Sequence, residues 1–191
     1  MILVVLENQR GNIHAFSKEA VAAGQSLASQ LGMDVSILCM GENARSLKEQ
    51  AKDYKAKNLI LAEHDMTNAY SADGYSKVLS DVIKNVSPQY VVMGHSYMVR
   101  DFLPRVSAKL DLPFVSDIIS VTYDGDNPVF ARQVFNAKLA TNIQPDSSSN
   151  TTLLSFQSAA FSSDEIELGG SDAASVLEVS LNNEDIKSSS E

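Results

Sequence analysis

Short, mainly apolar runs punctuate the first half of the chain. They lie at residues 1–6, 35–40, 58–62 and 90–93, and each is followed by Gly or by polar residues. Continuous apolar runs of this length are typical of strands buried on both faces, as in a parallel sheet. The four runs are therefore predicted to be the first four strands.

Helical periodicity fills the intervals between these runs. A first helix is predicted to be capped by Ser17 and to stop at Gly32, because apolar residues between them recur at spacings of three and four. A short charged helix is predicted over residues 43–55, and an amphipathic helix over residues 71–86.

A fourth helix is predicted over residues 98–110, and a fifth strand opens at Pro113. Pro104 is tolerated best in a first turn, so this helix is expected to begin later than Met98. Strand and helix thus alternate strictly up to Asp117, which predicts a parallel sheet with helices on both faces.

The sequence pattern changes after Pro113, because the predicted strands are no longer separated by helices. Further strands are predicted at residues 114–123, 129–135, 138–143 and 151–156, with a turn at 124–127 and a loop at 145–150. They predict an antiparallel or mixed extension of the sheet. Residues 1–161 are predicted to form one α/β domain, a three-layer Rossmann-like sandwich. Residues 162–191 are rich in Ser and acidic residues and are predicted to be a linker, with an edge strand at 175–181.

The charge of the chain excludes some partners. The 191 residues carry a net charge of −9. No basic patch is available for nucleic acid or for an anionic membrane surface. The single cysteine, Cys39, lies in an apolar run and is predicted to be a buried thiol. The first eleven residues do not resemble a signal peptide and no apolar run is long enough to span a membrane, so a reducing, cytoplasmic setting is expected.

Loops at strand ends are the natural place to look for a ligand site in such a fold. Residues 7–12 follow the first strand and contain neither G-x-G-x-x-G nor a Walker motif. Gly41 and Gly94 each follow a strand, where a single glycine usually serves a turn. The paired glycines that universal-stress-type domains carry after their fourth strand are absent.

The polar residues do not compose an active site. His14, His64 and His95 lie far apart in the sequence, without the spacing of metal ligands. His95 stands at a strand-to-helix switch, which leaves a catalytic or proton-transfer role open for it. No G-x-S-x-G elbow is present. No catalytic, cofactor-binding or metal-binding residue is therefore nominated.

A few polar and charged residues are candidates for structural or interface roles. Asp101 and Arg105 are spaced to pair across one helical turn, either as a surface pair or as a fork offered to another subunit. Ser116 and Asp117 are candidates to cap or clamp a neighbouring loop. Arg132 is expected to project from a strand, into an ion pair or an interface.

The most specific sequence motif in the chain is RDFLPRVSAKLDLPFVSD, at residues 100–117. It resembles the N-terminal domain of the alpha subunit of electron transfer flavoprotein. Two further segments are similar: FARQVFNAKLA at residues 130–140, which lacks a glycine of the family pattern, and TLLSF at 152–156, followed by Ala160 and Phe161. Gln157 stands where the family has an arginine.

The resemblance implies an adenine-nucleotide-alpha-hydrolase-like α/β domain with a structural role. It would pack on the beta subunit of a heterodimer and support a C-terminal FAD domain, which passes electrons from acyl-CoA or other dehydrogenases to the respiratory chain. The glycine-rich segment that opens the family's flavin site does not occur here, so FAD is expected in the intact subunit and not on this chain, and no catalysis by the chain alone. Fragment and natural short protein both stay open.

The sequence also leaves other hypotheses open. A small nucleotide-binding regulatory protein of the universal-stress type would bind AMP or ATP at the strand ends. An adenylate-forming or amidating ligase would need a phosphate loop after the first strand. A homodimer of the isolated domain is a further option, because missing partners would leave apolar surface bare.

Overall fold

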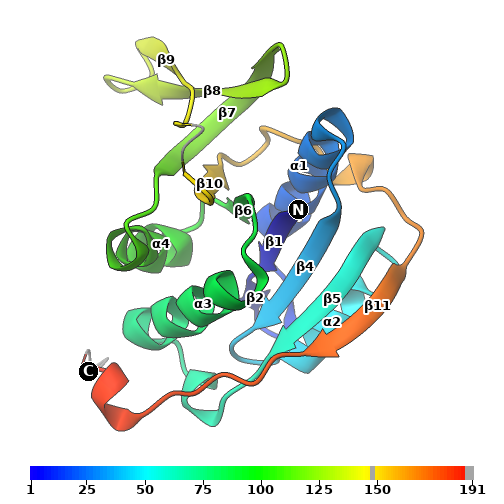
Figure 1. Cartoon of the computed structure of the whole chain (residues 1–191), viewed down its shortest axis with the longest axis vertical. Coiled ribbons are helices and arrows are strands. Elements are labelled where there is room, and N and C mark those ends of the chain that lie inside the picture. Colours follow the sequence, from blue (N-terminus) through cyan, green and yellow to red (C-terminus); the bar gives the residue numbers. More distant parts are fainter. Residues whose placement is uncertain (147–148, 188–191) are drawn as a thin grey trace.

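A computed structural model describes residues 1–146 and 149–187 (Figure 1). Within this part of the chain, nine strands form one sheet in the order β11-β5-β4-β1-β6-β10-β7-β8-β9. Its strands are β1 (Ile2–Leu6), β4 (Val35–Met40), β5 (Ala56–Ala62), β6 (Tyr90–Gly94), β7 (Phe114–Asp124), β8 (Asn127–Val134), β9 (Leu139–Ile143), β10 (Thr152–Phe156) and β11 (Ser171–Val176).

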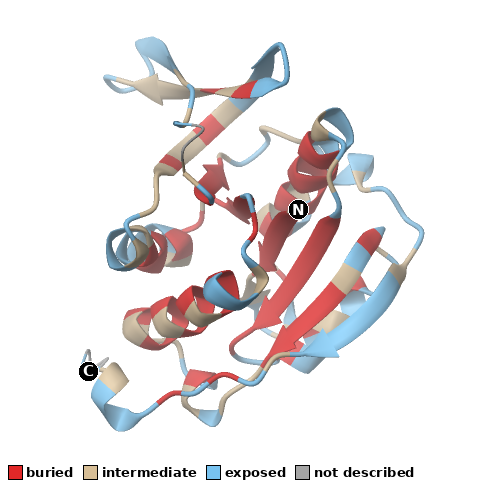
Figure 2. Cartoon of the chain, viewed as in Figure 1, coloured by how far each residue is buried: buried red, intermediate tan, exposed pale blue. Residues whose placement is uncertain are grey.

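Helices cover both faces of the sheet, which confirms the predicted three-layer α/β sandwich. They are α1 (Ala15–Leu31), α2 (Ala44–Ala51), α3 (Ala72–Val86) and α4 (Tyr97–Leu110). Alternate residues of β1 supply two separate cores. Ile2, Val4 and Leu6 pack with α1 and α2, whereas Leu3 and Val5 pack with α3 and α4. Burial on both faces explains why β1 is apolar throughout (Figure 2).

The strand predicted at residues 151–156 exists as β10, but it lies inside the parallel sheet. It pairs in parallel with β6 on one side and with β7 on the other. The prediction of an antiparallel or mixed extension therefore applies to β8 and β9, which follow β7 in antiparallel order. Local periodicity indicates that a strand forms, but it does not indicate which strands will be its neighbours.

The outer part of β7 bends away from the parallel sheet. Asp117 has a φ of 60°, and the pairing of β7 with β8 shifts register between Ile118 and Ser120. Beyond this bulge, Phe130 of β8 packs edge-on against Tyr90 of β6 with ring centroids 6.4 Å apart. Figure 1 shows β7, β8 and β9 as an arm at one end of the molecule.

Two predicted helix starts were wrong. His14, not Ser17, caps α1, because its Nδ1 accepts a hydrogen bond from the amide of Phe16 at 3.0 Å. Helix α4 begins at Tyr97 and contains Pro104 in its interior. The Ser96 hydroxyl accepts a hydrogen bond from the amide of Val99 at 3.1 Å, which fixes this early start.

Other boundaries differ by a few residues. Helix α2 ends at Ala51, earlier than predicted. The loop after β1 contains a small hairpin, β2 (Asn8–Gln9) and β3 (Asn12–Ile13), whose turn residues Arg10 and Gly11 both have positive φ. Single-turn 3-10 helices complete the described elements: η1 (Asp65–Thr67), η2 (Ser163–Glu165) and η3 (Asn183–Asp185).

The edge strand predicted at residues 175–181 was placed too late, because β11 begins four residues earlier, at Ser171, and residues 177–181 are not part of a strand. Strand β11 pairs in parallel with β5. The segment after it returns to the body, where Val179 and Leu181 are buried in the core against α3 and the Lys187 amide donates to Asp73 at 3.0 Å. The predicted boundary at residue 161 stays a prediction. Parts of the predicted loop 145–150 and linker, at residues 147–148 and 188–191, lie outside the described residues.

Candidate functional site

The expected position of a ligand crevice in this architecture is between the carboxyl ends of β1 and β6. Strands β4 and β5 lie on one side of β1, whereas β6 lies on the other, so the chain reverses its direction of progress here. Open parallel sheets bind ligands at such a switch point. The segments that bound it are residues 7–12 after β1 and residues 95–96 after β6.

The chain's own side chains bridge this crevice. The Ser96 hydroxyl, at the start of α4, donates a hydrogen bond to the Glu7 carboxylate. The Glu7 amide in turn donates to the Ser17 hydroxyl at 2.9 Å. Burial raises the pKa of Glu7, and the hydrogen bond from Ser96 and the proximity of His14 partly offset this shift. The Glu7 carboxylate therefore lies at the N-terminus of α4. A helix N-terminus is otherwise a favourable position for an anionic ligand.

The floor of the same crevice is packed tightly. A Cβ placed on Gly94 would lie 2.5 Å from the Cβ of Phe16 and 2.6 Å from its carbonyl oxygen. Gly94 thus lets α1 approach β6 closely, and its lack of a side chain serves helix–sheet packing rather than a phosphate.

Gly41 has a comparable role at the end of β4. Its φ is +80°, and a Cβ there would lie 2.1 Å from the Tyr75 hydroxyl. That hydroxyl accepts a hydrogen bond from the amide of Glu42 at 3.2 Å. The two glycines singled out in the sequence are therefore both explained by contacts within the chain.

His95 is part of a polar cluster that lies beside this crevice. Its Nδ1 and the Ser155 hydroxyl share a hydrogen bond of 2.9 Å, and its Nε2 lies 3.9 Å from Oδ1 of Asp117. Ser, His and Asp in this sequence of contacts resemble a hydrolytic triad. Ser155, however, is completely buried, and its hydroxyl also accepts from the Asp117 amide at 3.4 Å. The set holds β6, β7 and β10 together and does not present a nucleophile.

Two arginines complete this cluster. Burial lowers the pKa of His95, and the charges of Arg100 and Arg132 act in the same direction, while Asp117 opposes them. The Nε of Arg132 is buried and has no hydrogen-bond partner among the described residues. The sequence singled out Arg132, His95 and Asp117 separately, and the structure brings them together.

The other two histidines serve as caps. His14 begins α1, and His64 accepts a hydrogen bond from the amide of Met66 at 3.2 Å at the start of η1. In the described part of the chain, no group of three His, Cys, Asp or Glu side chains is arranged to hold a metal ion. Cys39 is buried as predicted, and burial raises the pKa of its thiol to about 12.

The predicted pair on α4 is confirmed and extended. Arg105 lies 3.4 Å from Asp101 and also 3.3 Å from Asp73 on α3. The Tyr70 hydroxyl donates to Asp101 at 2.7 Å. These contacts join α3 to α4, so the pair is engaged within the domain. None of the helices in residues 1–146 and 149–187 combines the length and the apolar composition that a membrane span requires.

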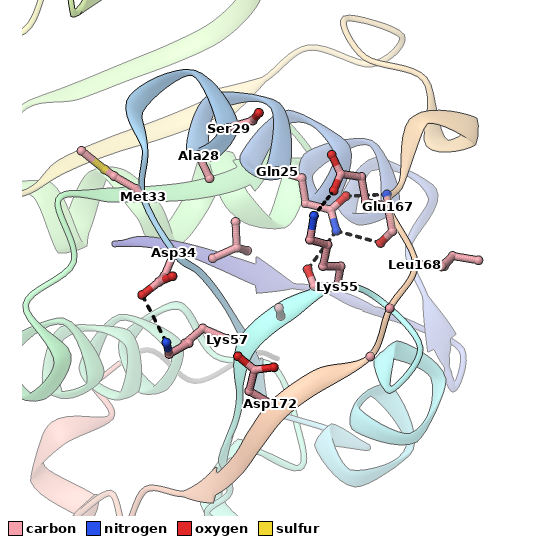
Figure 3. A pocket seen from close by; sticks show the side chains of 14 residues that line it. Gln25, Ala28, Ser29, Met33, Asp34, Lys55, Lys57, Glu167, Leu168 and Asp172 are labelled. Atoms are coloured by element: carbon pink, nitrogen blue, oxygen red, sulfur yellow. Dashed lines mark hydrogen bonds and ion pairs between the residues drawn. The ribbon is translucent and has the colours of Figure 1, made fainter.

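A groove of about 740 Å³ lies at the opposite, amino edge of the sheet (Figure 3). Buried Gln25 ties its walls together, because its amide bonds to the backbone of Lys55 and of Glu167. Lys55 pairs with Glu167 at 2.6 Å, and Lys57 with Asp34 at 3.8 Å. Both cations are thus already matched by the chain's own carboxylates. Sequence reasoning did not find this groove, since residues 25, 55 and 167 are distant in the chain.

Comparisons with known proteins give this architecture a family. A family model described as "Electron transfer flavoprotein domain" matches residues 2–182. The chain belongs to the electron transfer flavoprotein domain family. The electron transfer flavoprotein subunit alpha of Bacillus subtilis (strain 168) is 34% identical over 137 residues, which cover 72% of this chain and 42% of that protein.

Other relatives in the family are more distant. The electron transfer flavoprotein subunit alpha of Clostridium acetobutylicum is 25% identical over 144 residues, 74% of this chain and 43% of that protein. The acryloyl-CoA reductase electron transfer subunit beta of Anaerotignum propionicum is 26% identical over 123 residues, 64% of this chain and 34% of that protein. The chain spans less than half the length of these relatives.

The turn between β8 and β9 has a left-handed backbone at three consecutive residues. There Phe135, Asn136 and Ala137 take φ values of 53°, 55° and 62°, which glycine adopts at least cost. Gln157 follows β10, and its backbone amide donates to the carbonyl of Ile118 at 2.8 Å.

Proposed function

We propose that this chain is the N-terminal structural domain of an alpha-type electron transfer flavoprotein subunit. It would pack on the complementary beta-type subunit and support a separate FAD-binding domain. In this proposal the flavin carries electrons from acyl-CoA or other dehydrogenases toward the respiratory chain. The chain itself would supply surfaces and would catalyse nothing alone.

The observation that carries the proposal is the family match over residues 2–182, together with the similarity to the alpha subunit of Bacillus subtilis. The shared region covers less than half of that subunit, so the remaining part of the relatives is the candidate location of the flavin chemistry. The contacts of Glu7 with Ser96 and of Phe16 with Gly94 support a scaffold role, because they join the chain to itself at the switch point where a nucleotide would bind in this architecture.

The same contacts weigh against the universal-stress alternative. A nucleotide at the switch point needs glycine amides and a cationic or neutral environment for its phosphates. Here the Glu7 carboxylate lies at the start of α4, and the backbone and Cβ of Phe16 lie against Gly94. Calorimetric titration with ATP and AMP separates the two functions, since the scaffold proposal predicts no heat of specific binding and the alternative predicts saturable binding.

Association with the complementary subunit tests the proposal directly. The chain and the beta-type subunit of the same organism are mixed and followed by sedimentation velocity. A one-to-one complex is expected. Two unassociated species at micromolar concentrations would contradict the proposed role, since subunits of a permanent heterodimer bind more tightly than that.

A further inference from the structure

A bend in β7 joins the arm of the sheet to its parallel part. We define the arm as residues 118–143, which comprise the outer part of β7 together with β8 and β9. Asp117, just before the arm, has a φ of 60°, in a region that costs a residue with a Cβ. Its amide donates to the Ser155 hydroxyl of β10 at 3.4 Å, and the Gln157 amide donates to the carbonyl of Ile118 at 2.8 Å. A change at Ser155 is therefore placed to act on the base of the arm.

His95 contacts both sides of this bend. Its Nδ1 lies 2.9 Å from Oγ of Ser155, and its Nε2 lies 3.9 Å from Oδ1 of Asp117. The Asp117 carboxylate favours the tautomer that carries its proton on Nε2, because this N–H then faces a negative charge. Nδ1 consequently accepts from the Ser155 hydroxyl, whose oxygen in turn accepts from the Asp117 amide. With a neutral ring, the buried hydroxyl has both a donor and an acceptor.

Protonation of the His95 ring is incompatible with this arrangement. An imidazolium donates from both nitrogens, so Nδ1 can no longer accept from Ser155. Ser155 is completely buried, and its hydroxyl proton then needs another acceptor away from water. At the same time, the charged ring attracts the Asp117 carboxylate, which lies beyond hydrogen-bond distance of Nε2. Both changes act on the residue whose backbone forms the bend.

The charged groups around His95 come from several elements. Helix α4 contributes Arg100, β8 contributes Arg132 and β7 contributes Asp117, whereas β10 carries no ionisable side chain. On the side of β1, the Glu7 carboxylate accepts from the hydroxyl that caps α4. Burial lowers the pKa of His95, Asp117 opposes this shift, and the two arginines reinforce it. The ring is therefore mainly neutral at pH 7 and becomes charged below its ordinary pKa of 6.5.

We propose that His95 is a proton-operated switch at the base of the arm, whose protonation breaks the hydrogen bonds of Ser155 with His95 and with the Asp117 amide and loosens the arm from the parallel sheet. Figure 1 shows the arm leaving the body through β7. Phe130 and Ile143 pack against the core, so the arm is expected to loosen at its base without unfolding. The switch operates in the chain alone and does not depend on the proposed function.

NMR spectra of the full 191-residue chain, recorded between about pH 8 and about pH 5.5, test this switch. The titration of the His95 ring is compared with the backbone amides of Val134 and Leu139, which pair at the outer end of the arm. Hydrogen exchange of the arm, corrected for the intrinsic effect of pH on exchange, is measured over the same range. We expect both amides to shift with the midpoint of His95, and the protection of the arm to fall by about threefold or more once the ring is charged.

Variants of three titratable residues identify the group responsible. In His95→Asn the side-chain carbonyl can still accept from Ser155 but cannot be protonated, so the response of the arm should disappear. His64→Asn is the matched control, because His64 also accepts a backbone hydrogen bond at a helix start, where asparagine is a good cap. Glu7→Gln removes the neighbouring carboxyl group whose pKa is raised by burial. The response should persist in both control variants.

Asp117→Asn separates a switch from a merely structural role and carries the test if His95→Asn does not fold. Asparagine tolerates the left-handed backbone, and the variant removes the charge that raises the pKa of His95. The midpoint of His95 and that of the arm should both move to lower pH by the same amount. Three results would overturn the inference: arm amides that do not follow the His95 midpoint, a response that survives His95→Asn, or a wild-type ring that stays neutral down to about pH 5.5.

Discussion

The Ser96 hydroxyl donates a hydrogen bond to the Glu7 carboxylate across 89 positions of sequence. This contact joins the carboxyl end of β1 to the start of α4 and closes the switch point of the sheet. The same hydroxyl caps α4 by accepting from the amide of Val99. A ligand site in this fold would need the space between these two residues, so the contact is central to the scaffold interpretation.

The first prediction concerns the pH dependence of stability. Burial raises the pKa of Glu7 above its ordinary value of 4.5, so the folded protein holds this proton at pH values where the unfolded chain has released it. The contribution of Glu7 to the free energy of unfolding is therefore largest below pH 4.5 and declines as the pH rises through the folded-state pKa. Urea unfolding of the wild type and of Glu7→Gln, between about pH 4 and about pH 8, measures this difference.

The wild type should lose stability relative to Glu7→Gln as the pH rises across that range. The variant Ser96→Ala sharpens the test, because the hydrogen bond from Ser96 lowers the pKa of Glu7 and its loss should raise that pKa further. A folded-state pKa of Glu7 below 4.5, measured by NMR titration, would contradict the account of this crevice.

The second prediction concerns the packing of Gly94. The variant Gly94→Ala places a methyl group against Phe16 and its backbone, with contacts as short as 2.5 Å. Such overpacking should lower the free energy of unfolding by about 1–3 kcal/mol. Gly169→Ala is the matched control, because its nearest neighbour would be at 3.6 Å. Equal denaturation midpoints for the two variants would show that α1 and β6 are not packed as described.

The third prediction concerns the turn between β8 and β9. Ala137 has a φ of 62°, in a region that costs a residue with a Cβ about 1–2 kcal/mol. Glycine removes this cost but is more flexible in the unfolded chain, so Ala137→Gly should raise the free energy of unfolding by about 0.5–1 kcal/mol. Ala140→Gly, in the exposed strand β9, should lower it by a similar amount. Thermal melts that rank the two variants in the reverse order would be inconsistent with this turn.

The fourth prediction tests the domain boundary expected at residue 161. Chain 1–161 lacks β11 and the buried side chains of Val179 and Leu181. Each apolar side chain of this kind contributes about 1.5–3 kcal/mol, so the shortened chain should lose about 3–6 kcal/mol of stability. Val176→Ala, at a position that is 68% exposed, is expected to change stability little. An unaltered urea midpoint for chain 1–161 would instead support the boundary.

The sequence was most informative where burial determines composition. Strands β1, β4 and β6 are apolar because both of their faces meet helices, so their runs predicted them directly. The Asp101–Arg105 pair was also predictable, since a spacing of four places both side chains on one helix face.

Contacts between residues that are distant in the sequence could not be predicted in the same way. Strand β10 pairs with β6 and with β7. Its pairing with β7 joins two strands that are separated in the sequence by β8 and β9. Strand β11 has exposed residues on both faces, so it shows no alternation and was placed too late in the chain. The contact between Glu7 and Ser96 joins two ordinary loop residues, and neither has a motif that would indicate its partner.

The central claim is that this domain is a scaffold and that flavin chemistry belongs to another part of the complex. The most direct measurement is a visible absorption spectrum of the purified chain after incubation with FAD and gel filtration. The scaffold role predicts that no flavin absorption is retained with the protein. Stoichiometric retained flavin would contradict it, because the crevice bounded by Glu7, Phe16, Gly94 and Ser96 would then have to open and admit the cofactor.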